Sequence, residues 1–196
     1  VRHDLSEDSG RSAATWSKIL PFVIIIWAMT GAFYPAIDLC AGEKERGTLE
    51  TLLSSPASRY EIVFGKLVTV MVFSIATSLL NLLSMGLTGK FVFSQLQNVA
   101  NLGGLQMGPP PLESVVWIVL VLIPIAALFS GLSLALAAMA RSSKEGQYYL
   151  MPLMLGTMPL MMLPMLPAVE MDLGNSLIPV TGVILLLRSL MEGQYL

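Results

Sequence analysis

The stretch SVVWIVLVLIPIAALFSGLSLALAAMA, residues 114–140, contains no charged residue. A helix rises about 1.5 Å per residue, so it needs about 20 apolar residues to cross a hydrocarbon core about 30 Å thick. This stretch is therefore long enough to span a membrane. Three further charge-free windows of similar length, residues 19–37, 67–89 and 146–169, support the same interpretation.

The composition of the whole chain agrees with these windows. Of the 196 residues, 55% are hydrophobic and only 12% are charged, whereas a soluble domain carries roughly 25% charged residues. The mean hydropathy is +0.73. These values exclude a soluble globular enzyme, a disordered tail and a nucleic-acid binder. The single cysteine, Cys40, excludes a disulfide framework and a multi-cysteine metal site.

We predict an all-α membrane protein built as a bundle of four transmembrane helices. The spans are expected at residues 16–39, 62–89, 114–140 and 146–166. Residues 1–15 are polar and are predicted to form a tail. Residues 90–113, rich in Gly, Pro, Gln and Asn, are predicted to form a loop. The apolar stretch 173–187 is too short and too interrupted to span, which favours a re-entrant or interfacial helix on the extracytoplasmic side.

Basic residues in the loops indicate the orientation. Residues 41–66 and the short turn 141–145 must lie on one side if four spans alternate, and together they contain six Lys or Arg residues. The opposite loops contain two, although the N-terminal tail adds three to that side. Because cytoplasmic loops carry an excess of Lys and Arg, we predict that residues 41–66 are cytoplasmic.

The charged segment GEKERGTLETLLSSP, residues 42–56, predicts a short amphipathic helix at about 43–56. Thr48 is a candidate N-cap, three leucines follow at i, i+3 and i+4 spacing, and Pro56 ends the helix. The S-x-x-E spacing of Ser58 and Glu61 then predicts a capping box that opens the second span.

The mixed charges around the small apolar stripe suit docking onto a charged groove of another protein. An interfacial helix whose leucines enter lipid is the alternative. In that arrangement Glu43, Glu45 and Glu50 would face anionic headgroups unfavourably.

Residues 42–66, GEKERGTLETLLSSPASRYEIVFGK, resemble the cytoplasmic coupling segment of ABC-2 type transporter permeases, in particular the sodium-extrusion-like Nat-type branch. Residues 175–193 resemble the short extracytoplasmic helix that precedes the last span of such permeases. The resemblance covers residues 1–196 as a single permease transmembrane domain, with the four spans matching the second to fifth of six. Because the chain starts at Val1, we expect the first and last spans to lie outside it.

The resemblance implies a permease half that pairs with a second permease copy and with two cytosolic ABC ATPase subunits. The coupling helix is expected to dock on the ATPase through a set of leucine anchors and register-setting charges, with a glycine that permits the turn into the helix: Glu43, Glu45, Arg46, Gly47, Thr48, Leu49, Glu50, Leu52 and Leu53. The chain lacks a G-x-x-x-x-G-K-[ST] motif, so ATP and Mg²⁺ are expected on the partner. No catalytic, cofactor or metal residue is assigned to this chain. The expected location is the bacterial inner membrane, with the protein as a multi-pass exporter subunit.

Small residues recur at four-residue spacing in the third span, at Ala127, Gly131 and Ala135. Such a face lets helices approach closely, which favours helix packing within the permease or a seam between permease copies. The methionine-rich fourth span is interpreted as an adaptable packing surface. No charged residue or histidine lies inside the four windows, so no carboxylate there supports sodium as the substrate.

Two other classes of function remain as alternatives. A secondary transporter or channel fragment predicts midplane charges or inverted repeats, and the sequence shows neither. A membrane anchor of a larger membrane enzyme is the other alternative. An intramembrane protease needs a buried nucleophile or metal ligands, and the one histidine, His3, lies in the polar tail. The substrate and the direction of transport stay open.

Overall fold

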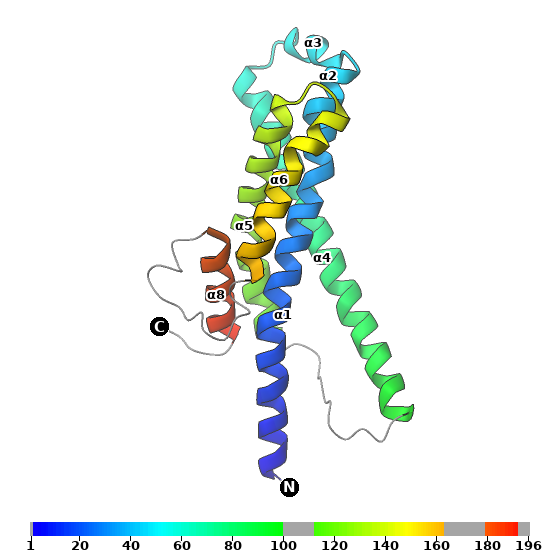
Figure 1. Ribbon diagram of the computed structural model, residues 1–196, viewed down its shortest axis with the longest axis vertical. Coiled ribbons are helices and arrows are strands. Elements are labelled where there is room, and N and C mark those ends of the chain that lie inside the picture. Colours follow the sequence, from blue (N-terminus) through cyan, green and yellow to red (C-terminus); the bar gives the residue numbers. More distant parts are fainter. Residues whose placement is uncertain (1, 100–111, 163–178, 192–196) are drawn as a thin grey trace. The chain divides into compact units, whose positions relative to one another are not determined.

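The computed structural model describes residues 2–99, 112–162 and 179–191, and every element in these ranges is helical. The prediction of an all-α protein is therefore confirmed (Figure 1). The helices are, in order, α1 (Arg2–Ile37), the π-helix η1 (Asp38–Gly42), α2 (Glu43–Glu45), α3 (Thr48–Leu53), α4 (Arg59–Val99), α5 (Leu112–Met139), α6 (Ser143–Met162) and α8 (Pro179–Met191).

Three of the described helical stretches are long and apolar enough to cross a membrane: Ile19–Glu45, Arg59–Gly89 and Val116–Met139. They coincide with the first three predicted spans. The fourth predicted span, 146–166, falls on α6 as far as Met162, and its last residues lie outside the described ranges. The described part of α6 is less apolar than these three stretches, because Lys144 and Glu145 lie in its first turn and Gly, Gln, Tyr, Thr and two prolines follow.

Two predicted boundaries were wrong. Helix α1 already begins at Arg2, where a polar tail was expected, and α4 continues to Val99, through the first ten residues of the expected loop. Neither polar stretch contains proline, and residues 90–99 also lack glycine. Adding residues to an existing helix is much easier than starting one, so a polar composition alone did not end these helices.

The last described helix, α8, begins inside the predicted stretch 173–187 and continues past its end to Met191. Its buried residues include Val180, Ile184 and Leu187, spaced as one face of a helix. An amphipathic helix is therefore present here. The prediction that it is re-entrant or interfacial stays a prediction.

Contacts divide the chain into two compact units. One comprises Val1–Ile24, Leu79–Val121 and Met161–Leu196, and it includes α8. The other comprises Ile25–Ser78 and Leu122–Leu160. This second unit contains the whole charged segment between α1 and α4 and the turn between α5 and α6, so it contains every residue assigned to docking.

Small residues build the centre of the second unit. Ala28, Ala32 and Ala36, four residues apart on α1, have no exposed surface. Beside them Gly31 lies so close to α4 that an added Cβ would be 3.0 Å from the Cα of Ser74. The hydroxyl of Ser74 donates a hydrogen bond to the carbonyl oxygen of Ala28 at 2.6 Å. Close backbone approach thus holds α1 against α4.

Candidate functional site

The segment between α1 and α4 forms a structured cap at one end of the second unit (Figure 1). α1 passes through η1 into α2, and the chain then turns at Gly47 before α3 begins. Gly47 has φ 72°, a left-handed conformation that glycine adopts without steric cost. The structure therefore divides the single helix expected at about 43–56 into two short helices.

The two predicted caps have different outcomes. Gly47, rather than Thr48, is the N-cap of α3. The Thr48 hydroxyl instead donates to the carbonyl oxygen of Glu43 at 3.2 Å, which ties α3 to α2. The predicted capping box is confirmed, because the Ser58 backbone N–H donates to Glu61 Oε2 at 2.8 Å and the Glu61 N–H donates to Ser58 Oγ at 3.3 Å.

Two lysines attach the cap to the neighbouring helices. Lys66 on α4 forms an ion pair with Glu43 on α2, and its Nζ also donates to the carbonyl oxygen of Leu39 at 2.5 Å. The side chains of this pair are only 13% and 22% exposed. Lys44 donates to the carbonyl oxygens of Ala138 and Ala140, the latter at 3.1 Å, and so reaches the end of α5.

A glutamate attaches the cap to α6. Glu45 Oε2 accepts hydrogen bonds from the Ser143 backbone N–H at 2.8 Å and from the Ser143 hydroxyl at 2.7 Å. Ser143 is the first residue of α6, so the carboxylate also lies at a helix N-terminus. Arg46 pairs with Asp38 at 2.8 Å, but both side chains are more than half exposed, so this pair contributes little to stability.

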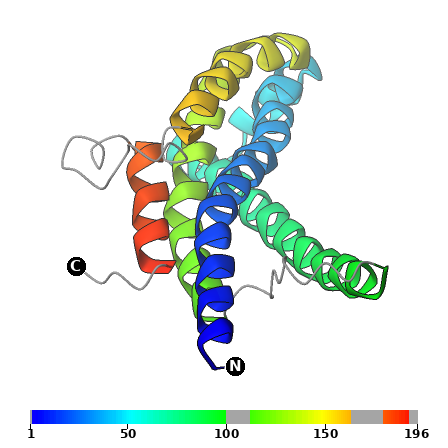
Figure 2. The ribbon, with the colours of Figure 1, turned by 60° about the horizontal axis from the view of Figure 1, so that its bottom comes forward.

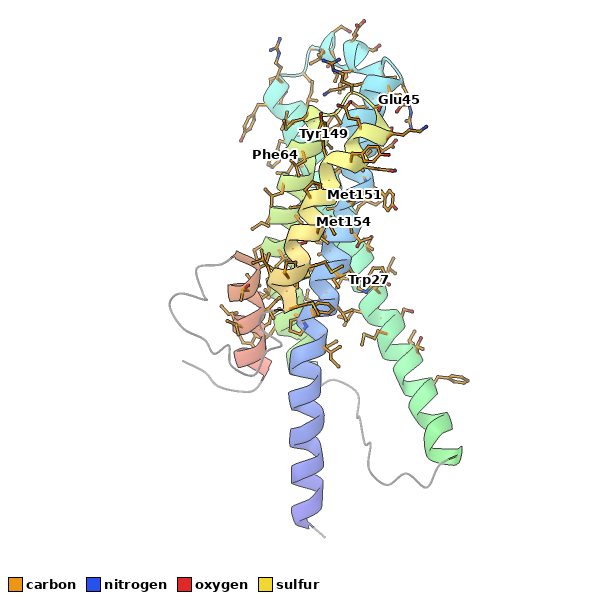
Figure 3. The ribbon with its side chains drawn as sticks, in the orientation of Figure 1. Trp27, Glu45, Phe64, Tyr149, Met151 and Met154 are labelled. Carbon is orange, nitrogen blue, oxygen red and sulfur yellow. The ribbon has the colours of Figure 1, made fainter. Side chains whose placement is uncertain are left out.

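The turn that joins α5 to α6 can be followed in the ribbon of Figure 2, and one of the first residues of α6, Glu145, holds it. Glu145 Oε2 accepts from the Arg141 backbone N–H at 2.8 Å, and the Tyr149 hydroxyl donates to Oε1 at 2.9 Å. These hydrogen bonds, the one from Arg141 first, hold the pKa of the Glu145 carboxyl below its usual value. Glu45 and Tyr149 lie at the same end of the unit (Figure 3). The charged segment 41–66 and the turn 141–145 are therefore close together, which is the arrangement expected if successive spans run in opposite directions.

The three predicted leucine anchors do not share one environment. Leu49 and Leu53 line a groove of about 530 Å³ between α3, α4 and α5, although Leu53 is still 52% exposed. Leu52 is half-buried. The side chains of Glu50 and Thr51 are exposed, so the outward face of α3 is polar with one leucine at its edge.

The small-residue face of α5 lines the same groove. Gly131 and Ala135 are among its lining residues, and a Cβ added to Gly131 would lie 3.8 Å from Leu67 Cδ1, an ordinary contact distance. Ala127 is half-buried. Tighter approaches in this unit occur elsewhere, at Gly31, Gly42 and Gly146. A seam role for the α5 face stays a prediction.

Sequence reasoning missed the close-packed face of α1. Its signal was present, because Ala28, Ala32 and Ala36 repeat the small-residue spacing that was recognised only in the third span. Within the described ranges, no group of three or more His, Cys, Asp or Glu side chains gathers as a metal site would require.

The sequence of the chain matches known proteins along most of its length. Residues 5–191 match the family model of the ABC-2 family transporter proteins. The chain is 30% identical over 192 residues to the ABC transporter permease protein NatB of Bacillus subtilis (strain 168). That alignment covers 97% of this chain and 48% of the relative, so the chain spans about half the length of the curated relative that it matches. No solved structure matches.

The apolar helices and the family model together identify a multi-pass integral membrane protein. The family model covers nearly the whole chain, including the cap and all three candidate spans. The resemblance of residues 42–66 to a permease segment is thus supported by a match far longer than that segment. The chain belongs to the ABC-2 family of transporter proteins.

Proposed function

We propose that this chain is the permease part of an ATP-driven exporter in a bacterial inner membrane, energised by a separate cytosolic ABC ATPase and paired with a second permease copy. The observation that carries the proposal is the cap: a short structured segment that faces outward on one side and is attached to three helices on the other. Family membership and the bacterial relative add support.

The outward side of the cap is the proposed docking face, and it consists of Arg46, Gly47, Glu50, Thr51 and Leu53. It offers charges of both signs around an exposed leucine. Leu53 at 52% exposure leaves apolar surface for a partner to cover. A few apolar anchors with polar residues around them are typical of protein interfaces.

The inward side of the cap is the proposed route of transmission. Lys44 joins α2 to the end of α5, Glu45 joins it to the start of α6, and Lys66 joins it to α4. A displacement of the docking face by the ATPase would therefore reach four helices, counting α1, which continues directly into the cap. Glu43, Glu45 and Thr48 act in this scheme by positioning the docking face rather than by touching the ATPase.

Reversing the charge of Glu50 is the direct test of docking. Glu50→Arg should lower the amount of ATPase that co-purifies with the permease, because Glu50 is exposed on the docking face and forms no ion pair among the described residues. The measurement is co-purification and ATPase activity with a co-expressed ABC ATPase partner. Arg141→Glu, an exposed charge reversal outside the docking face, is the matched control. Wild-type recovery of the ATPase by Glu50→Arg would contradict the proposal.

Removing the Glu45 carboxylate tests transmission separately from docking. Glu45→Ala should keep the ATPase bound but reduce its stimulation by the permease, because the docking face is unchanged while α2 loses its two hydrogen bonds to Ser143. Hydrogen exchange over residues 43–53 should become faster in the same variant. If hydrogen exchange and ATPase stimulation were both unchanged in Glu45→Ala, the attachment of Glu45 to Ser143 would play no part in transmission.

The alternative classes predict different results. A secondary transporter or channel fragment would work without a bound ATPase, so Glu50→Arg would leave its transport unchanged. A membrane anchor would tolerate both Glu45→Ala and Glu50→Arg. The absence of co-purifying ATPase from wild-type preparations would favour these classes over the exporter.

A further inference from the structure

The groove beneath the cap lies entirely in the second unit and has the size of a binding pocket. Its volume is about 530 Å³, within the range of roughly 300–1,000 Å³ found for small-molecule sites. Leu49 and Leu53 of α3, Phe64 and Leu67 of α4, and Leu134 of α5 supply apolar walls. Of these wall residues, only Leu53 also belongs to the docking face.

The charges around the groove have one sign. Three of the described residues that line it are charged, and all three are basic: Lys44, Arg59 and Lys66. Lys66 is neutralised by Glu43, and Lys44 is engaged with α5 carbonyl oxygens. In the ranges that the structure describes, no carboxylate lies within ion-pair distance of the Arg59 guanidinium. The groove thus offers an apolar interior and one available cation at its rim.

The groove lies at the ends of two candidate spans. Arg59 is the first residue of one candidate span, and Ala138, which also lines the groove, is next to the last residue of another. The stacked rings of Tyr60 and Phe64 on α4 have centroids 6.4 Å apart and are 80% and 55% exposed. Exposed aromatic and basic side chains at the end of a span are typical of the membrane interface.

We propose that this groove binds one anionic phospholipid, with an acyl chain against the apolar walls and the phosphate at the Arg59 guanidinium. Charge complementarity selects this occupant, because an apolar ligand would not need Arg59 and a soluble anion would not need the apolar walls. Guanidinium is suited to phosphate, which it binds through a planar pair of donors. The lipid would fill the space between the cap and the spans, and so would support α3 from beneath.

Native mass spectrometry of the full-length protein in detergent tests this assignment. Phosphatidylglycerol and phosphatidylcholine with identical acyl chains are titrated in parallel. Wild type should bind phosphatidylglycerol more tightly. Arg59→Gln should weaken phosphatidylglycerol binding about fivefold, the effect of one basic residue on an anionic lipid. It should weaken phosphatidylcholine binding less, because the choline cation of that lipid offsets the phosphate charge that attracts Arg59. Arg141→Gln, which removes an exposed arginine outside the groove, should change neither.

A second variant fills the apolar part of the groove. Ala135 lines the groove and is exposed, so Ala135→Trp should cause loss of both lipids. Leu132→Trp is the matched control, because Leu132 is exposed on α5 but does not line the groove. Thermal unfolding of each variant checks that it is folded.

Three outcomes would overturn the proposal. Equal affinity of wild type for the two lipids would remove the role of charge. An equal loss in Arg59→Gln and Arg141→Gln would indicate attraction to the protein surface in general. The third outcome is a wild-type protein that forms a dimer without bound lipid, together with an Ala135→Trp variant that is a monomer. That result would assign the groove to a second copy of this chain.

Discussion

Replacing Gly31 by alanine should destabilise the protein by about 1–3 kcal/mol, the usual cost of inserting a methyl group into a packed core. An added Cβ would lie 2.9 Å from Thr77 Cβ and 3.0 Å from Ser74 Cα. The second of these is a backbone atom, so α4 itself must move. Because the Ser74 hydroxyl bonds to the Ala28 carbonyl oxygen at the same crossing, that movement also strains a buried hydrogen bond. Thermal unfolding in detergent measures the loss.

Gly65→Ala is the matched control for this prediction. Gly65 is also helical and lies on α4 in the same unit, but a Cβ there meets nothing within 4 Å. Alanine is a better helix former than glycine, so Gly65→Ala should keep or slightly raise the unfolding temperature. If the two variants unfolded at the same temperature, the close approach of α1 to α4 would be refuted.

The sequence was sufficient to predict the helical class, because charge-free apolar windows of about 20 residues have the length that a membrane-spanning helix requires. It also predicted the capping box at Ser58 and Glu61, which depends on a local spacing of three residues. Both features are local in the chain. The misplaced ends of α1 and α4 were judged from composition, which does not stop a helix in the way that proline does.

The sequence predicted which segment forms the candidate site, but not how the side chains of that segment are arranged in space. Periodicity placed three leucines on one face, yet it did not tell that Leu49 and Leu53 line a groove in the same chain. Likewise the charges of Lys44 and Glu45 suggested a partner protein. Their hydrogen-bond partners lie 94 to 98 residues away in the sequence, and only the tertiary fold brings them within reach.

Replacing Lys66 by methionine should also have a large effect, because it leaves the Glu43 carboxylate in a mostly buried position without its partner. Breaking a fully buried pair costs about 3–5 kcal/mol. These side chains retain 13% and 22% exposure, so we expect about 2 kcal/mol after partial solvation of the carboxylate. The Leu39 carbonyl oxygen loses a donor in the same change. The measurement is thermal unfolding in detergent.

Two comparisons separate lost charge pairing from lost packing. Adding Glu43→Gln to Lys66→Met should recover part of the stability, because the amide carries no charge to leave unpaired; the four proteins form a double-mutant cycle. Arg46→Met breaks the exposed pair with Asp38, whose side chains are 67% and 61% exposed, and should change stability little. Equal losses in Lys66→Met and Arg46→Met, or no recovery with Glu43→Gln, would mean that Lys66 does not hold the cap through its charge.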